Sequence, residues 1–213
     1  MSKRRKQAPG LAMVLLATLA LAGCVTESGE VPGSGESGQS EVLAGSLTEL
    51  FEQKMETTDN AFVLEVLERS METGSIAQQD YDEAHRLYAE CMTDAGYDET
   101  YRQDTNGVWR ITPPPLSGGE EVERYMSIGA DCSDELAPIE SLFTVQQGNP
   151  DLLADPAAAV AACLREAQLV SADYTGEAFA ADLESGFDNA SYDVNSAEAQ
   201  SCFSGNGYAV NVQ

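Results

Sequence analysis

Four widely spaced cysteines offer the plainest chemistry in this sequence: Cys91, Cys132, Cys163 and Cys202. A structural zinc site usually takes its thiolates in close pairs, two to four residues apart. Neighbouring members of this set are instead separated by 31 to 41 positions. An even number of such cysteines in an exported protein predicts two disulfides rather than a metal site.

A fifth cysteine, Cys24, follows an export signal. Basic residues at 3–6 precede an apolar run at 11–22, and small residues come next, which is the pattern of a secretory signal peptide. The run is shorter than the roughly 20 residues that span a bilayer. The segment 21–24, Leu-Ala-Gly-Cys, resembles the lipobox of bacterial lipoproteins. The resemblance implies a signal peptide at 1–23 and a lipidated Cys24 as the mature N-terminus; the alternative is an ordinary cleaved signal beside an unmodified cysteine.

The charge of the mature chain restricts its partners. Cleavage removes four of the 11 Lys and Arg residues and leaves 7 against 36 Asp and Glu, a net charge near −29. Such a surface repels nucleic-acid phosphates and anionic lipid headgroups. We therefore expect no nucleic-acid partner. We expect attachment to the extracytoplasmic face of the membrane through acyl chains on Cys24, each buried methylene contributing about 0.8 kcal/mol.

The composition divides the mature chain in two. Residues 24–45 are rich in Gly, Ser and Glu without helical or strand periodicity, which predicts a flexible tether with a reach on the order of 25 Å. Residues 46–213 are numerous enough for one domain with a sizeable core. The segment 148–150, Gly-Asn-Pro, is a possible boundary within that domain.

Four cysteines allow three disulfide connectivities, and the sequence does not choose between them. We favour Cys91–Cys132 with Cys163–Cys202, because this pairing gives each half of the domain its own crosslink. Loops of this size would contribute roughly 3–4 kcal/mol each in the chain-entropy model.

The apolar spacing predicts a mainly α-helical, disulfide-crosslinked domain with one small β-hairpin. The strongest helix covers 78–95. Asn106-Gly107 between extended runs predicts a hairpin over 100–112, which must pack on helices through Trp109 and Ile111 because a lone hairpin is marginal. Other helices are expected after the N-caps Ser46, Asp59, Ser117, Asp155 and Thr175, and over 138–147 and 195–203, with Tyr208, Val210 and Val212 in an extended tail. The side chains expected to face inward from the helices after Ser117 and Thr175 are Val122, Tyr125, Met126, Gly129, Cys132, Phe179 and Leu183.

A shared pattern follows three of the cysteines, in segments 91–97, 163–169 and 202–208. Each has an apolar residue directly after the cysteine and an apolar or aromatic residue five positions later. This spacing predicts Schellman caps, with a left-handed residue at Gly96, Gln168 or Gly207. Gln168 departs from the pattern because glycine fits that conformation best. Each cysteine would then lie in the last turns of a helix and face the core.

The sequence contains few residues or motifs that are typical of a catalytic or metal site. The one histidine, His85, has Asp82 three residues earlier, but no second imidazole exists and we expect a solvated surface residue. The segment 104–107 resembles part of a calcium loop, yet positions 102 and 113 are Arg and Pro where carboxylates are required, so a hairpin turn explains it better. No zinc-protease, P-loop or dinucleotide motif is present. We therefore predict no catalytic residue, metal site or cofactor.

Three aromatic residues near the predicted hairpin, Tyr97, Tyr101 and Trp109, could line a sugar-binding surface, or could simply pack the hairpin on a core. The helix ending at 88–97, Tyr-x-x-Cys-Met-x-x-x-Gly-Tyr, and the later Ala-Cys-Leu at 162–164 resemble small cysteine-paired lipoproteins of actinobacteria. The resemblance implies a helix–disulfide scaffold without catalytic residues. We expect a non-enzymatic envelope module that binds a partner protein or cell-wall component; the alternatives are a carboxylate-based cell-wall hydrolase and a small solute-binding lipoprotein.

Overall fold

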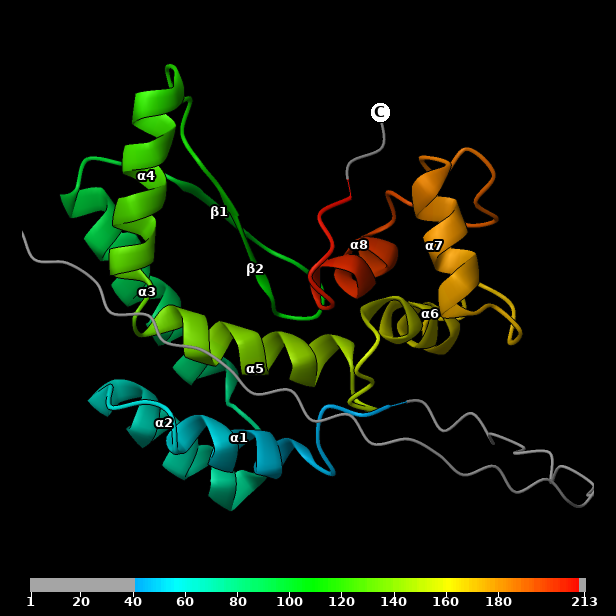
Figure 1. Cartoon of the computed structure of the whole chain (residues 1–213), viewed down its shortest axis with the longest axis horizontal. Helices are drawn as coiled ribbons and strands as arrows, with labels where there is room; N and C mark the ends of the chain where they lie inside the picture. Colours follow the sequence, from blue (N-terminus) through cyan, green and yellow to red (C-terminus); the bar gives the residue numbers. More distant parts are fainter. Residues whose placement is uncertain (1–40, 211–213) are drawn as a thin grey trace, which may run out of the picture. The chain divides into compact units, whose positions relative to one another are not determined.

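The computed structural model describes residues 41–210, in which eight helices and one two-stranded antiparallel sheet form the mainly helical domain that the sequence predicts (Figure 1). The helices are α1 Leu47–Met55, α2 Ala61–Thr73, α3 Gln78–Asp94, α4 Gly119–Cys132, α5 Leu136–Gly148, α6 Pro156–Glu166, α7 Gly176–Glu184 and α8 Ala197–Ser204. The strands are β1 Thr100–Gln103 and β2 Trp109–Thr112. The expected signal peptide, Cys24, most of the expected tether and Val212 lie outside the described residues.

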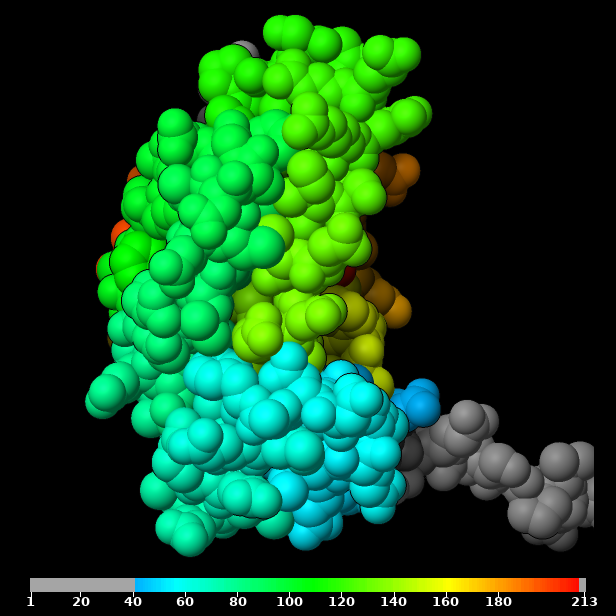
Figure 2. Space-filling model, turned by 90° about the vertical axis from the view of Figure 1, so that its left-hand side faces the viewer, coloured from blue at the N-terminus to red at the C-terminus, as the bar shows by residue number. Residues whose placement is uncertain are grey.

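Helix α1 packs against α2 and α5, and Figure 2 shows the cyan residues of the first two helices directly against the yellow-green residues of α5. Ser46 caps α1 as predicted, since its hydroxyl accepts the Glu49 N–H at 3.1 Å. The Glu49 carboxylate in turn accepts the Gly45 N–H at 2.8 Å. These two bonds satisfy amide groups that the first turn of a helix leaves unpaired.

The prediction that Asp59 caps α2 is wrong. Asn60 takes the position, and its side-chain oxygen accepts the Val63 N–H at 3.1 Å. Both residue types can cap a helix. Asn60 also donates its amide N–H to Glu135 at 3.2 Å, a contact from 75 residues away that the local sequence does not reveal.

Helix α4 departs from prediction in its start and in its orientation. It begins after Gly118, whose φ of 86° turns the chain, and Ser117 makes no side-chain cap. Instead the Ser117 N–H donates to the Glu121 carboxylate. Val122 and Met126, expected to face inward, are 43% and 63% exposed, because α4 packs mainly against α3 and buries the face next to them.

All three predicted Schellman caps are present. Gly96, Gln168 and Gly207 have φ values of 91°, 58° and 78°. In each cap, the residue after the left-handed one donates its N–H to the carbonyl five residues earlier, at 2.9–3.0 Å. The bond from the Tyr97 N–H to the Met92 carbonyl is one example. Gln168 therefore adopts the left-handed conformation without being glycine, at a cost of about 1–2 kcal/mol. Gly186, with φ 67°, completes a similar cap after α7, which the cysteine-based pattern does not predict because α7 contains no cysteine.

Two clusters of buried side chains stabilise the domain. The first core consists of Phe51, Val63, Val66, Leu67, Ile76, Tyr81, Ala84, Tyr88, Met92, Tyr97, Val108, Cys132, Leu136, Ile139, Leu142 and Phe143. The second core consists of Val160, Leu164, Phe179, Phe187, Val194, Ala199, Cys202, Phe203 and Val210. Leu183, expected to face inward beside Phe179, is instead exposed.

The disulfides pair as predicted, Cys91 with Cys132 beside the first core and Cys163 with Cys202 beside the second. The prediction that every cysteine faces the core is wrong for Cys91, which is exposed while the adjacent Met92 is fully buried. The bond joins the C-terminal ends of α3 and α4 at the edge of the first core.

Contacts between α5 and α8 connect the elements that carry the two cores. Gly148, the last residue of α5, and Gly205, the C-cap of α8, approach so closely that a Cβ on Gly148 would lie 2.6 Å from the Gly205 carbonyl carbon. Asn206 donates its side-chain N–H to the Gly148 carbonyl oxygen at 2.9 Å. The chain before α1 also reaches this region, since the Leu43 N–H donates to the Leu152 carbonyl at 2.7 Å.

Candidate functional site

A shallow hollow of about 210 Å³ lies where the hairpin packs on α3. Helix α3 contributes side chains three or four residues apart, which share one face of a helix, and each strand contributes one aromatic ring. The lining residues are Asp82, His85, Arg86, Ala89, Tyr101 and Trp109. The strand register places Tyr101 opposite Ile111 and Trp109 opposite Gln103, so the two rings come from one face of the hairpin.

Trp109 is half-buried and held in place by hydrogen bonds at both its ring and its backbone. Its indole Nε1–H donates to Asp82 Oδ1 at 2.8 Å, and Gln78 Nε2 donates to the same oxygen at 2.9 Å. The backbone N–H of Trp109 donates to the hydroxyl of Tyr81 at 3.2 Å. The ring is thus fixed before any ligand arrives, which reduces the entropy lost on binding.

Tyr101 is fixed through the carboxylate of Glu99. The Tyr101 hydroxyl donates to Glu99 Oε2 at 2.5 Å, and the hydroxyls of Tyr88 and Tyr125 donate to Oε1, that of Tyr88 at 3.3 Å. Burial, reinforced by the negative charge of Glu99, raises the pKa of Tyr88 to about 12. The same two causes raise the pKa values of Tyr101 and Tyr125. All three hydroxyls therefore stay protonated donors at neutral pH.

Tyr97, the third predicted ligand-binding aromatic residue, does not line the hollow. It is 7% exposed, belongs to the first core, and meets the ring of Tyr125 edge-on at a centroid distance of 5.2 Å. The structure therefore brings two of the three aromatic residues together and assigns Tyr97 to packing.

His85 is buried, so its expected exposure on the surface is wrong. Only 5% of the residue is exposed, and its Nε2 lies 2.8 Å from Glu140 Oε2 in α5. The Tyr81 hydroxyl donates to the same oxygen at 2.6 Å, and burial together with Glu140 raises the pKa of Tyr81. His85 Nδ1 has no hydrogen-bond partner among the described residues. A contact 55 residues away in the sequence thus decides the environment of His85.

Glu140→Ala should lower the free energy of unfolding by about 2 kcal/mol, because it leaves His85 Nε2 and the Tyr81 hydroxyl hydrogen without an acceptor in a buried region. Urea denaturation followed by Trp109 fluorescence measures the loss. Glu65→Ala is the matched control, since Glu65 is 72% exposed and only pairs with Arg69; its effect should stay within about 0.5 kcal/mol. Equal losses in the two variants would contradict a structural role of the buried network.

The carboxylates of Asp82, which lines the hollow, and of Glu140, which contacts His85, are engaged by the protein. Each accepts two hydrogen bonds through one oxygen. No group of three or more His, Cys, Asp or Glu side chains within residues 41–210 is arranged to hold a metal ion. Asp104, whose segment resembles part of a calcium loop, lies at the hairpin turn, where its backbone N–H donates to the Val108 carbonyl at 2.8 Å.

The two disulfides indicate an oxidising, extracytoplasmic environment. In the part of the chain that the structure describes, no helix is long and apolar enough to cross a bilayer. Comparison with protein-family models, with curated proteins and with solved structures finds no match to this chain.

Proposed function

We propose that this protein is a non-enzymatic binding module, held at the extracytoplasmic face of the cell membrane by acyl chains on Cys24, which binds a saccharide of the cell envelope. The lipobox-like segment 21–24 and the two disulfides support the location. The observation that carries the binding role is the pair of preorganised rings, Trp109 and Tyr101, at the hollow on α3.

The hollow has the features of a saccharide site. Aromatic rings present an apolar surface to the C–H groups of a sugar. Asp82 and Arg86 also line the hollow, whose exposed surface is almost entirely apolar and so suits such C–H contacts. Arg86 is about half exposed and pairs with Glu83 and Glu90 at 2.8 and 2.9 Å.

The size of the hollow favours one unit of a polymer over a complete small solute. Pockets for drug-sized ligands usually enclose about 300–1,000 Å³, and this hollow has about 210 Å³. A single ring-sized group fits such a volume, and the rest of the ligand extends over the surface. This feature separates the proposal from a solute receptor, which would need to enclose its ligand.

Fluorescence tests the binding role directly, because Trp109 is the only tryptophan in the chain. The full-length protein in detergent micelles is titrated with soluble fragments of cell-wall glycan. We expect a saturable change in Trp109 emission. Tyr101→Ala should weaken the affinity roughly tenfold through loss of one ring, whereas Tyr101→Phe, which keeps the ring, should stay within about threefold. An emission that glycan does not change would contradict the proposal.

Fractionation tests the anchor. Cys24→Ala should release the protein from membranes, because the acyl chains would have no attachment point. Immunoblotting of membrane and soluble fractions measures the release. Cys91→Ala with Cys132→Ala serves as the control, since it removes thiols that are not part of the lipobox-like segment. Continued retention of the Cys24 variant would show that another anchor exists.

A further inference from the structure

The face of the hairpin opposite the hollow carries two arginines side by side. Arg102 in β1 is the register partner of Arg110 in β2, and Thr100 is the partner of Thr112 two residues further along. Side chains alternate between the two faces of a sheet, so these four residues share the face that Trp109 and Tyr101 do not use. Like charges directly opposite each other on neighbouring strands are destabilising.

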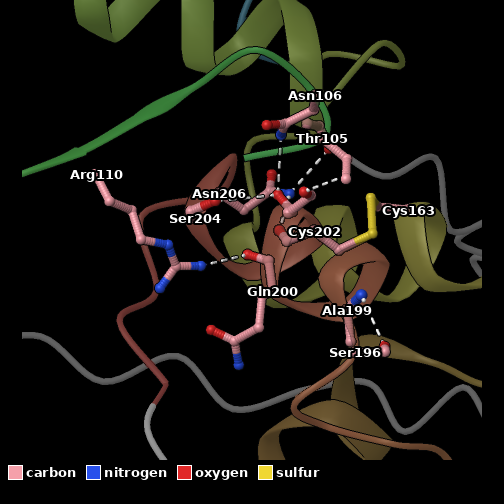
Figure 3. Close-up of a disulfide and its surroundings, with 12 residues drawn as sticks. Thr105, Asn106, Arg110, Cys163, Ser196, Ala199, Gln200, Cys202, Ser204 and Asn206 are labelled. Atoms are coloured by element: carbon pink, nitrogen blue, oxygen red, sulfur yellow. Dashed lines mark hydrogen bonds between the residues drawn. A yellow bond between two sulfur atoms is a disulfide. The ribbon is translucent and has the colours of Figure 1, made fainter. Parts of the chain in front are cut away.

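One buried carboxylate lies between the two guanidinium groups. Asp104, whose side chain is only 4% exposed, contacts Arg110 Nε at 2.9 Å through Oδ2 and Arg102 Nη2 at 3.2 Å through Oδ1. The Ser204 hydroxyl donates to Oδ2 at 3.0 Å. Arg110 also donates through Nη2 to the Gln200 carbonyl of α8 at 3.2 Å, as Figure 3 shows. These bonds hold Arg110 against α8, whereas Arg102 has, within residues 41–210, the single ion-pair contact with Asp104.

The charges at this face do not balance. Arg69 contacts two carboxylates, those of Glu65 and Asp80, and Arg86 likewise contacts two. Arg102 and Arg110 instead share one, with no second carboxylate in ion-pair distance of either among the described residues. The pair therefore keeps about one positive charge in a chain whose formal net charge is −25.

A groove of about 560 Å³ opens beside this pair, between the hairpin and the segment after α8. Its volume lies in the range of about 300–1,000 Å³ that is usual for small-molecule sites. Thr, Ser and Tyr residues accompany the two arginines in its lining. The residues that line it are Thr100, Arg102, Arg110, Ile111, Thr112, Ser204, Gly207, Tyr208 and Ala209.

We propose that this groove binds an oxyanion, a carboxylate or a phosphate group, through Arg102 and Arg110. The anion would supply the negative charge that Asp104 alone does not, and guanidinium groups bind both kinds of oxyanion through paired N–H donors. Arg102, whose side chain is 68% exposed, can turn toward a ligand, while Arg110 is fixed. The site is separate from the saccharide hollow and does not depend on it.

Calorimetric titration of the full-length protein in detergent micelles with inorganic phosphate and with acetate tests the proposal. We expect saturable binding of at least one of the two, and Arg102→Gln should weaken it roughly tenfold or more through loss of a charged hydrogen bond. Arg102 is exposed, so the variant should stay folded, which far-UV circular dichroism verifies. Arg124→Gln changes an exposed arginine in α4 that lines neither the groove nor the hollow and gives the same change of charge, so it should alter the affinity less than about twofold.

The results of this titration distinguish phosphate from carboxylate as the ligand, and they also show whether the proposal fails. Binding of phosphate alone would assign the groove to phosphate groups, and binding of acetate alone would assign it to carboxylates; either supports the proposal. Equal losses in Arg102→Gln and Arg124→Gln would overturn it, because only the net charge would then matter. Saturable binding of neither anion would also overturn it.

Discussion

Replacing Cys163 and Cys202 together by alanine is expected to lower the stability of the second core by about 4 kcal/mol. The disulfide links residues 39 positions apart, and in the chain-entropy model a loop of this length gives about that contribution. The second core has nine buried residues against sixteen in the first, so less burial remains to offset the loss. Urea denaturation of the full-length protein measures the change.

Two probes distinguish the cores in that experiment. Trp109 packs against the first core and its fluorescence reports unfolding there, whereas far-UV circular dichroism reports helices of both cores. The circular dichroism signal of the Cys163 and Cys202 variant should therefore fall at lower urea than its fluorescence. In the matched Cys91→Ala and Cys132→Ala variant, the fluorescence transition itself should move to lower urea. Coincident transitions shifted by less than about 1 kcal/mol in both variants would contradict this model.

Gly148→Ala is expected to have the second large effect, a loss of about 2–3 kcal/mol. The added Cβ would lie 2.6 Å from the carbonyl carbon and 2.7 Å from the Cα of Gly205, and both are backbone atoms that cannot rotate away. The chain must then separate α5 from α8, and overpacking of this kind usually costs about 1–3 kcal/mol. The contact of Asn206 with the Gly148 carbonyl would weaken with it.

Thermal unfolding of Gly148→Ala and of a matched glycine variant measures how much stability depends on the close contact between Gly148 and Gly205. Gly119 is the first residue of α4, and a Cβ there would meet nothing within 4 Å. Gly119→Ala should be neutral or stabilise the protein by about 0.5 kcal/mol, because alanine restricts the unfolded chain. If both glycine variants unfold at the wild-type temperature, the approach of α5 to α8 does not limit stability.

The features that depend on residues close together in the sequence could be predicted from it. The helix over 78–95 differs from α3 by one residue at its end, because its apolar spacing agrees with its helical propensity throughout. The three Schellman caps were found from five-residue spacings, since the bond that defines such a cap lies within the segment. The disulfide pairing was also predicted, because each pair connects helix ends within one half of the domain.

The errors come from contacts that the local sequence does not contain. Asp59 and Asn60 are equivalent as caps, and the bond from Asn60 to Glu135 distinguishes them. Val122 and Met126 have the spacing of a buried face, but α4 turns another face to α3. The apolar spacing of α3 predicts an exposed His85, but the packing of α5 against this helix buries the imidazole beside Glu140.

From the sequence came the helices and the hairpin, a preference for one of three disulfide pairings, and the expectation of an exported, lipid-anchored, strongly acidic protein. Those features depend on neighbours in the chain, on composition, or on cysteine spacing. The tertiary structure alone decided the sites. The hollow needs α3 and both strands, and the arginine groove needs the strand register together with α8. Trp109 lies 27 residues from Asp82, and Arg110 lies 90 residues from Gln200, so these groups meet only when the cores fold.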